Sequence, residues 1–463
     1  MRVRNKWLAI FLVMGLTLAA CSPSDSSDTT EGATATTEGA TATTEGATDT
    51  TEGATDTTEG AREIATDIGV DLEAGTITVG FLTDQTGVFS PLVTVVNTGI
   101  EAYWANVNAN GGVHGLEVVL DFGDTAYNGE QHVQLFEEMK DEVVAFGHSV
   151  GSPQTVAITP GLIEQGMLAI PLTWYSGWSD PNYNSSVVPH GTPYCIEAMN
   201  SIEYMAGETG LDSPTVAIAS IGGDYGLDAS DGARLAAEAL GLEIVYDGAG
   251  AIVAGDPTSY IEVGNAIAEA DPDIVYHTGI PWLGWPEVYT QAAITNGLEA
   301  LWSGASPSWA PNYVSEDSGI RDEIARDMYW GFYLQPWDGD SEGAATVREV
   351  MTAAGAPPHD YYGEGFVEGQ LLLQALNIAY ENGDMTQAGV LAAAKSIESV
   401  DYNGLAPSDD YVGEPNEIVQ RVVHMMRPDL TSETGSKLVQ ADYTSPTAAA
   451  YEFNGACFLL ELG

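Results

Sequence analysis

The stretch that decides the fold is TITVGFLTDQTG, residues 76–87. Its apolar part, residues 76–82, predicts a buried strand, and the polar and glycine residues that follow predict a loop. Beyond this loop, Ile100, Trp104 and Val107 recur at the spacing of one helix face. A buried strand, a short loop and an amphipathic helix make the first half of a βαβ unit, which is typical of a parallel sheet covered by helices.

This alternation of strands and helices continues along most of the chain. Further strands are expected at residues 116–122, 143–146, 168–171, 215–219, 242–246, 274–277 and 300–303. Helices are expected between and after them, at residues 130–140, 155–165, 196–208, 227–240, 260–270, 287–295, 366–381 and 387–396. About 390 residues in this pattern are too many for one sheet and its core, so we expect an α/β protein of two lobes.

The order of the segments predicts how the lobes are connected. Each lobe should be a parallel sheet flanked by helices, and the last two predicted helices should return to the first lobe, so that the hinge is crossed more than once. The resulting division is a signal peptide at 1–21, a tether at 22–74, lobe I at 75–195, lobe II at 196–335, a return to lobe I at 336–405, and lobe II with a C-terminal segment at 406–463.

The chain begins with the pattern of an export signal. Arg2, Arg4 and Lys6 form a basic start, residues 8–18 are apolar, and small residues precede Cys21. The apolar run is too short to span a bilayer comfortably. The box Leu-Ala-Ala-Cys that ends at Cys21 resembles the bacterial lipoprotein signal, which implies cleavage before the cysteine and acyl chains attached to it. An ordinary secretory signal with a chance cysteine is the alternative.

A low-complexity segment follows this cysteine. The unit Thr-Thr-Glu-Gly-Ala-Thr-Ala/Asp recurs every seven residues from Thr29 to about Ala61. The period is that of a coiled coil, but each copy contains a glycine and none contains a large apolar residue, so there is no seam to bury. We expect a disordered tether. About fifty such residues have an r.m.s. reach of roughly 40 Å, which suits a partner fixed in a membrane.

The charge balance excludes one broad class of partner. The chain has 67 acidic and 13 basic residues and a formal net charge of −54, and only a minority of the acids lie in the tether. We therefore expect no binding to nucleic acid. The acids are expected to form a solvated shell, which salt would screen, rather than a cation-binding surface.

The sequence lacks the signatures of metal, cofactor and nucleotide sites. The seven histidines are scattered, without a His-Glu-x-x-His motif or a cysteine pair at zinc spacing. Asp224, Asp228 and Asp231 do not have calcium-loop spacing and are interpreted as a solvated helix start. There is no Walker lysine loop, so ATP hydrolysis would belong to a separate subunit. We expect no metal and no cofactor.

Two cysteines remain once Cys21 is assigned to the lipid. An exported protein meets an environment in which disulfides persist. Cys195 and Cys457 are therefore left either to form one disulfide or to stay as two buried thiols, since the sequence does not fix the distance between their Cα atoms.

Several segments together resemble a known family. They are VNANGGVHG at residues 107–115, which is the most specific, GDT at 123–125, DYG at 224–226, DYTSP at 442–446, and the regions 77–87 and 143–155. With the export signal, they make the chain similar to the substrate-binding proteins of branched-chain amino acid ABC transporters, the Leu/Ile/Val-binding family with the type I periplasmic-binding fold, in its lipoprotein form. The resemblance implies a non-enzymatic, extracytoplasmic receptor that captures a small ligand between its lobes and delivers it to a membrane permease.

Open parallel sheets bind ligands beyond the carboxyl ends of their strands, which places the ligand residues on the following loops. In lobe I the strand at 143–146 leads to Gly151 and Ser152, where backbone N–H groups, a hydroxyl and a helix start suit a carboxylate. The resemblance assigns this loop to the ligand carboxylate. It assigns Thr173 and Trp174, after the next strand, to the backbone atoms of the ligand.

In lobe II the candidate ligand residues are Tyr225, at the family's aromatic position, and Trp282, Trp302 and Ser306 on later loops. The family commonly has an acid in the loop at 304–309 to pair with the ligand ammonium, but this chain has Gly-Ala-Ser-Pro-Ser-Trp there. An ammonium buried without an anion is costly. The ligand class therefore stays open between a branched-chain or hydrophobic amino acid, a related acid or amide, and a quaternary ammonium held by tryptophan rings. The tryptophans expected to cluster on the cleft loops are Trp174, Trp178, Trp282, Trp285, Trp302 and Trp309.

Two other functions fit parts of the sequence. Gly147-His148-Ser149-Val150-Gly151 lies between a predicted strand and helix, as in the nucleophile elbow of a serine hydrolase. His277, His359 and His424 lie downstream as candidate bases. One hydrolase sheet, however, leaves the second series of strands unexplained. The remaining alternative is a receptor that reports its ligand to a membrane sensor.

Overall fold

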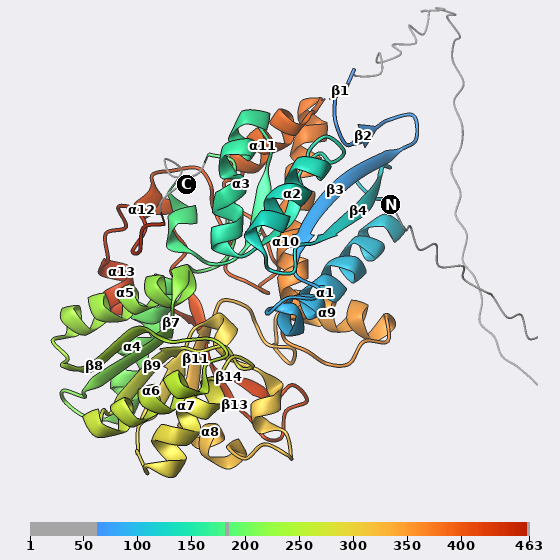
Figure 1. Cartoon of the computed structure of the whole chain (residues 1–463). Helices are drawn as coiled ribbons and strands as arrows, with labels where there is room; N and C mark the ends of the chain where they lie inside the picture. Colours follow the sequence, from blue (N-terminus) through green and yellow to red (C-terminus); the bar gives the residue numbers. More distant parts are fainter. Residues whose placement is uncertain (1–62, 181–184, 461–463) are drawn as a thin grey trace, which may run out of the picture. The chain divides into compact units, whose positions relative to one another are not determined.

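The structure is a computed structural model that describes residues 63–180 and 185–460. The predicted signal peptide, Cys21 and residues 22–62 of the predicted tether lie outside the described residues. The described part is a mixed α/β fold in which two main sheets form separate lobes (Figure 1). None of the helices in this described part combines the length and the apolar composition needed to cross a membrane.

Lobe I is built on a five-stranded sheet. Its parallel strands are β3 (Thr76–Thr83), β4 (Glu117–Asp124), β5 (Phe146–Val150) and β6 (Ala169–Leu172). β3 pairs with β4 on one edge and with β5 on the other, β6 pairs with β5, and the short β2 (Val70–Asp71) is antiparallel to the beginning of β3. The connecting helices are α1 (Ser90–Ala109), α2 (Gly129–Met139) and α3 (Ser152–Gln165).

The strand predicted at 76–82 is the centre of this lobe. Ile77, Val79 and Phe81 are buried in the same apolar cluster as Ile100 of α1, and Leu82 is buried in a second cluster. Burial on both faces is typical of a strand in a parallel sheet that is covered by helices on both sides.

Lobe II is built on a seven-stranded sheet in the order β14-β13-β11-β10-β9-β7-β8. Five strands are parallel: β7 (Val216–Ile221), β8 (Ile244–Ile252), β9 (Ile274–Thr278), β10 (Leu301–Gly304) and β11 (Met328–Phe332). β13 (Val423–Pro428) runs antiparallel to β11, and β14 (Ser436–Tyr443), at the edge of the sheet, runs antiparallel to β13. The sheet is mainly parallel, as predicted, and this antiparallel pair is an addition that was not predicted. A short hairpin loop joins β13 to β14, and such a pair needs no crossover helix.

Helices alternate with the parallel strands of lobe II. They are α4 (Tyr194–Thr209), α5 (Gly223–Leu240), α6 (Pro257–Ala270), α7 (Trp285–Tyr289) and α8 (Arg321–Asp327). The helix predicted at 287–295 begins at Trp285 as α7 and continues as a π-helical segment, Thr290–Thr295.

The chain returns to lobe I after β11. The helices α9 (Glu342–Ala353), α10 (Tyr362–Asn382) and α11 (Gln387–Lys395), orange in Figure 1, lie among the blue and teal elements of lobe I. α10 packs closely on α1 through two glycines. A Cβ on Gly99 would lie 2.5 Å from Tyr362 O, and a Cβ on Gly365 would lie 2.4 Å from Ile100 N. The missing side chains therefore permit this contact.

Within the described residues the chain crosses between the lobes three times, in segments 173–193, 333–341 and 396–422. The multi-crossing hinge thus follows from the order of the elements. Three connecting segments between the two lobes restrict the relative motion of the lobes to hinge bending.

Residues 63–74 correct the predicted extent of the tether. β1 (Ala65–Thr66) pairs with β12 (Asp384–Met385), and β2 pairs with β3. Val70 is buried, and Ile64 packs against the same apolar cluster. The seven-residue repeat contains no such side chains, and their burial explains why the folded part begins before residue 75.

Candidate functional site

A pocket lies where strand ends of both lobes meet. Lobe I contributes the segments that follow β3, β4, β5 and β6, and lobe II contributes the starts of α4 and α5 and the loop after β10. Open parallel sheets bind ligands at this position. Five of the eight predicted ligand residues line the pocket: Gly151, Ser152, Thr173, Trp174 and Tyr225.

The wall from lobe I presents a helix start and two hydroxyls. α3 begins at Ser152, and its N-cap, Gly151, has φ = +91°, a conformation that favours glycine. Pro153 in the first turn has no N–H that would need a partner. The hydroxyls of Ser152 and Thr173 hydrogen-bond each other, and both side chains are buried. This is a polar spot in an otherwise apolar wall, at the positive end of a helix.

Phe89 is held at the same wall by Asp84. The Asp84 carboxylate accepts hydrogen bonds from the backbone N–H of Gly87 at 2.5 Å and of Phe89 at 2.8 Å. Burial raises the pKa of Asp84, although these donors act in the opposite direction. The loop fixed in this way places Phe89 in the pocket beside Tyr127, with 4.5 Å between the ring centroids.

The wall from lobe II presents an acid beside an aromatic residue. Asp224 and Tyr225 lie in the first turn of α5, and Asp224 is only 6% exposed. Burial raises the pKa of the Asp224 carboxyl, and the side chain of Ser152, on the facing wall of the cleft, acts in the opposite direction. The Tyr225 hydroxyl lies 3.0 Å from Ser308 Oγ. Among the described residues that line the pocket, Asp224 is the only Asp, Glu, Lys, Arg or His.

Aromatic rings surround this acid. Tyr194 lies between Trp174 and Tyr225, with centroid distances of 5.9 Å and 4.7 Å. Burial, and after it the charge of Asp224, raises the pKa of the Tyr127 and Tyr194 hydroxyls, so both lie within its field. The buried indole N–H of Trp174 has no hydrogen-bond partner among the described residues. The pocket therefore offers one acid, several polar groups and apolar walls to an amphipathic ligand.

Three predicted ligand residues lie outside the pocket lining, and one of them, Trp282, contacts the pocket residue Phe89. Its Nε1 donates a hydrogen bond to Val88 O at 2.6 Å, and its ring meets Phe89 edge-on with centroids 6.4 Å apart. Trp282 belongs to lobe II and Val88 to lobe I. Trp282 therefore links the lobes at the rim of the pocket.

Trp302 and Ser306 point into lobe II instead. Trp302 is fully buried against Trp285, with centroids 5.1 Å apart, because the two-residue period of β10 turns it toward the helices behind the sheet. Ser306 donates from its hydroxyl and from its backbone N–H, at 3.2 Å, to the carboxylate of Glu197. Burial raises the pKa of Glu197 to about 8. Pro307, the next residue, is the one that lines the pocket.

The tryptophan cluster predicted around the ligand does not form. Trp309 stacks on Trp330 in the core of lobe II with centroids 4.4 Å apart, and Trp178 packs edge-on against Tyr175. Of the six tryptophans considered, all of them described, Trp174 alone lines the pocket. Its aromatic partners there are tyrosines and Phe89.

Several residues at or near the pocket were not predicted from the sequence. Asp224 and Asp228 were interpreted as solvated, yet both are buried, because α5 packs this face against α4 and the C-terminal segment. Asp224 directly precedes Tyr225, which the family resemblance assigns to the ligand, and this position was the one sequence signal for a place at the pocket. Tyr127 and Tyr194 lie in segments whose place at the cleft depends on lobe packing, and the sequence contains no local signal for them.

The elbow around Ser149 does not assemble a catalytic triad. Ser149 is fully buried, with its hydroxyl 3.2 Å from His132 Nε2 and 2.7 Å from Thr155 Oγ1. Burial lowers the pKa of His132 to about 3, and its Nδ1 has no partner among the described residues, so the orienting acid of a triad is missing. The three predicted bases make their contacts elsewhere: His277, His359 and His424. The structure does not favour a hydrolase.

The C-terminal segment ties the lobes together outside the pocket. Cys195, in the first turn of α4, and Cys457 form a disulfide with their Cα atoms 6.4 Å apart. Backbone N–H groups of the same segment donate to the loop after β6: Cys457 N to Ser176 Oγ and Leu460 N to Tyr175 OH, both at 2.9 Å. This loop begins with Thr173 and Trp174, so the segment supports the lobe I wall.

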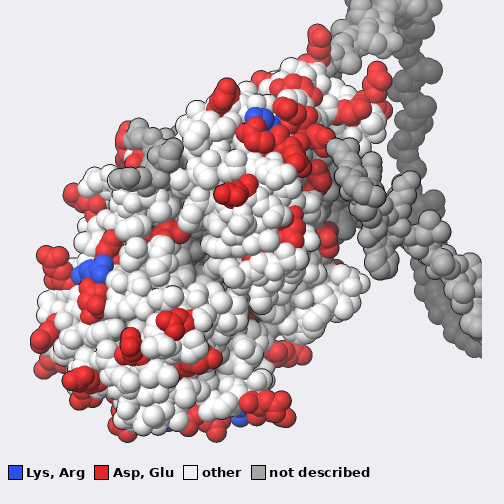
Figure 2. Space-filling view, in the orientation of Figure 1, with Lys and Arg blue, Asp and Glu red and all other residues white. Residues whose placement is uncertain are grey.

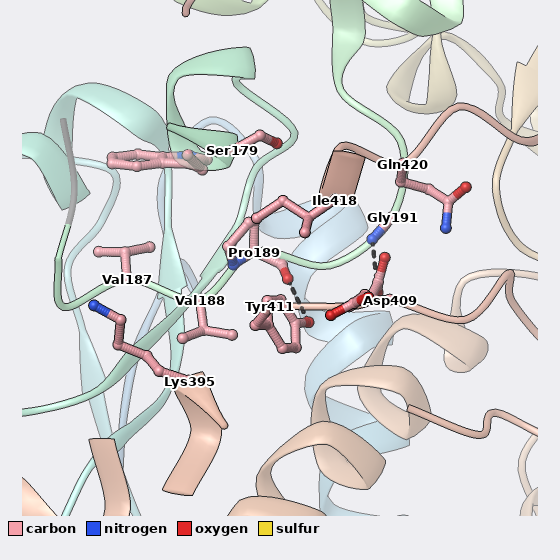
Figure 3. Close-up of a pocket in the computed structure, with 12 residues that line it drawn as sticks. Ser179, Val187, Val188, Pro189, Gly191, Lys395, Asp409, Tyr411, Ile418 and Gln420 are labelled. Carbon is pink, nitrogen blue, oxygen red and sulfur yellow. Dashed lines mark hydrogen bonds between the residues drawn. The ribbon is translucent and has the colours of Figure 1, made fainter. Parts of the chain in front are cut away.

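A second pocket lies at the hinge crossings (Figure 3). Tyr411 OH donates to Pro189 O at 2.7 Å, and Gly191 N donates to Asp409 at 3.2 Å, so the first and third crossings are joined beside it. Lys395, at the end of α11, reaches its edge. The lining comes from crossing segments and helix ends, whereas strand-end loops line the cleft pocket, and we therefore take the cleft pocket as the candidate ligand site.

The surface of both lobes is acidic. Figure 2 shows Asp and Glu side chains over both lobes, with few Lys or Arg side chains between them. Several of the basic residues are paired with adjacent acids: Lys140 with Glu137, Arg234 with Asp231 and Asp247, and Arg326 with Asp327. The field around the two lobes is therefore negative.

The fold is similar to that of several solved structures. A fatty acid ABC transporter substrate-binding protein from Thermomonospora curvata has 22% identity and a TM-score of 0.74, over 84% of this chain and 97% of that one. A branched-chain amino acid ABC transporter protein from Thermus thermophilus with bound valine has 19% identity and a TM-score of 0.68, over 81% and 97%. A branched-chain amino acid transporter substrate-binding protein from Streptococcus pneumoniae in complex with isoleucine has 15% identity and a TM-score of 0.63, over 79% and 99%.

At these identities the structural similarity concerns the fold alone. Comparison with curated protein sequences gave no match. A family model described as periplasmic binding protein matches residues 76–429, which is most of the described part of the chain. Two lobes, a hinge crossed repeatedly and a pocket at the facing strand ends agree with that match, and the chain belongs to the periplasmic binding protein family.

Proposed function

We propose that this protein is the extracytoplasmic solute-binding component of an ABC importer and captures a small amphipathic ligand between its lobes. The observation that carries this proposal is that strand-end segments of both lobes line one pocket. A ligand there contacts both lobes only when they are closed, so binding shifts the population toward the closed form. A membrane permease with a separate ATPase would recognise that form.

The walls of the pocket suit a ligand with a polar head and an alkyl part. The N–H groups at the start of α3 and the hydroxyls of Ser152 and Thr173 would bind the polar head. The alkyl part would pack on Leu92, Val93 and Leu172. The names of the similar structures mention fatty acid, valine and isoleucine, which all have this division.

The N-terminal part of the proposal is a lipid anchor. Cys21 would be acylated after removal of the signal peptide, and the acidic repeat would hold the folded lobes at a distance from the outer face of the cell membrane. Incorporation of labelled palmitate tests this. Labelling that persists in Cys21→Ser would contradict the assignment. We propose no catalytic activity for this chain.

Thermal unfolding of the full chain with leucine, valine, octanoate and leucine amide tests the solute-binding function. A ligand at a hundredfold excess over its Kd should stabilise the folded state by about 2.7 kcal/mol. Thr173→Val should weaken the binding of any ligand found, whereas Thr98→Val, on the exposed face of α1, should not. Melting curves that no ligand in the panel shifts would contradict the proposal.

A further inference from the structure

The pocket contains one acid that lacks a cation. Asp224 lines the pocket together with Ser152, and it takes part in none of the ion pairs found among the described residues. A buried carboxylate without a positive partner is unfavourable. An acid in this state, at a site open to a ligand, provides a binding position for a cation.

A ligand with only a carboxylate fits this arrangement poorly. Its carboxylate would approach the start of α3, where Ser152 lines the pocket together with Asp224. Two carboxylates in one buried pocket raise each other's pKa, so that one of them favours its protonated form when no cation lies between them. Such a ligand would therefore bind only with a proton taken up from solution.

The surroundings of Asp224 favour a positive charge. The rings of Tyr127, Tyr194 and Tyr225 line the same pocket, and aromatic faces attract an organic ammonium. The chain as a whole carries a formal charge of −54, which raises the local concentration of cations near the cleft. The unpartnered indole N–H of Trp174 supplies a donor for a second polar group of the ligand.

We propose that the ligand carries a positively charged nitrogen that binds against Asp224, in place of the acid that the loop at 304–309 lacks. The inference rests on the proposed solute-binding function and specifies its ligand class as an organic ammonium. An amino acid and a simple amine share this chemistry. An amino acid would in addition place its carboxylate at the start of α3, on the far side of the nitrogen from Asp224.

The test is calorimetry of the full chain with two matched ligand series. The first series is leucine, isoamylamine, which lacks its carboxylate, and 4-methylpentanoate, which lacks its nitrogen. The second is 2-aminooctanoate, heptylamine and octanoate. In the series that binds, the members with nitrogen should bind at least tenfold more tightly than the acid. If the amino acid also exceeds the amine, the natural ligand is zwitterionic, and if not, it is an amine.

Asp224→Asn supplies the second arm, with Asp360→Asn as its matched control. Asp360 has the same exposure, 6%, but its carboxylate accepts a hydrogen bond from the Ser436 hydroxyl, and it does not line the pocket. Asp224→Asn should weaken the binding of the nitrogen-containing ligands at least tenfold and leave the binding of the acids unchanged. Asp360→Asn should leave the binding of both kinds of ligand unchanged. Thermal melting establishes that each variant is folded.

The outcomes separate the inference from the function on which it rests. Tight binding of octanoate or 4-methylpentanoate by the wild-type chain, without proton uptake, overturns the ammonium assignment and leaves the solute-binding function standing. The proton balance comes from titrations in buffers of different ionisation enthalpy, so this result does not depend on the variant. Binding of none of the six compounds overturns both proposals.

Discussion

The two walls of the cleft pocket differ in how directly their strands lead to the ligand site. In lobe I, β5 ends at Val150 and α3 begins at Ser152, and the residues between and after them line the pocket. In lobe II the short connection from β7 to α5 likewise places Asp224 and Tyr225 in the pocket. The loops after β9 and β10, however, run for many residues before the next long helix, and Trp282 and Ser306 on them do not line it. A short strand-to-helix connection fixes its residues at the strand end, whereas a long one folds onto its own lobe.

The largest effect should come from replacing two tryptophans, one in the core of lobe II and one in the pocket. Trp302→Ala should lower the free energy of unfolding by about 3–5 kcal/mol, because it empties a fully buried site beside Trp285, yet the folded variant should keep its ligand affinity. Trp174→Ala should instead weaken ligand binding at least tenfold. Urea unfolding and calorimetry measure the two quantities. Equal losses of affinity in both variants would abolish the distinction between the walls.

Apolar runs between helical repeats are local signals, and they predicted the parallel strands of the two main sheets except β11, although β5, predicted at 143–146, lies at Phe146–Val150. Residues 143–155 and 168–174 also gave the lobe I wall, because strand and loop adjoin there. The antiparallel strands β13 and β14 and the position of Tyr194 at the cleft depend on contacts between distant segments. The burial of Asp224 depends in the same way on the packing of α5, and no local pattern encodes it.

The next largest effect concerns the C-terminal segment around Cys457, which is bonded to lobe II through Cys195 and supports the lobe I wall. Replacing both Cys195 and Cys457 by Ser should lower the free energy of unfolding by about 2–5 kcal/mol, since the disulfide closes a sequence separation of 262 residues. Release of Cys457 should also loosen its contact with Ser176 and weaken ligand binding. Urea unfolding with and without reductant measures the first effect. Cys21→Ser is the matched control, and a similar loss of stability in that variant would contradict the assignment.

The stability of the folded state should depend on pH because of Glu197, which accepts hydrogen bonds from Ser306 behind the lobe II wall. Burial raises the pKa of Glu197 from 4.5 to about 8, so the folded state keeps a proton that the unfolded state loses within this range. The contribution of protonated Glu197 to the free energy of unfolding is complete below pH about 4.5 and is lost as the pH rises to about 8. Stability should therefore fall by about 1.4 kcal/mol per pH unit across this window.

Glu197→Gln isolates this contribution. The neutral amide can still accept from Ser306, so the variant should be more stable than the wild type at pH 8 and should have a shallower pH slope. Glu238→Gln, on the exposed side of α5, is the control and should keep the wild-type slope. Urea unfolding at several pH values provides the measurement. An unchanged slope in Glu197→Gln would mean that the buried acid is ionised throughout.

Replacing Ser152 in the lobe I wall and Ser306 in lobe II should have smaller effects, and these two variants compare the walls directly. Ser152→Ala should weaken ligand binding roughly tenfold, the effect of losing one hydrogen bond to a charged group. Ser306→Ala should leave affinity nearly unchanged and lower stability by about 1–3 kcal/mol, because Glu197 loses its hydroxyl donor. Calorimetry and urea unfolding on both variants decide. A loss of affinity in Ser306→Ala equal to that in Ser152→Ala would place Ser306 in the site.

The smallest effect should appear at the rim, where Trp282 bonds Val88 across the cleft. Trp282→Phe keeps an aromatic ring against Phe89 and removes only the N–H that donates to Val88 O. One such hydrogen bond contributes about 0.5–1.5 kcal/mol, and it exists only when the lobes are together. The variant should therefore release ligand roughly two- to tenfold faster while its stability without ligand hardly changes. Stopped-flow dissociation measures this rate. If the rate is unchanged, the contact with Val88 does not hold the lobes closed, and the difference between the walls is confined to the pocket itself.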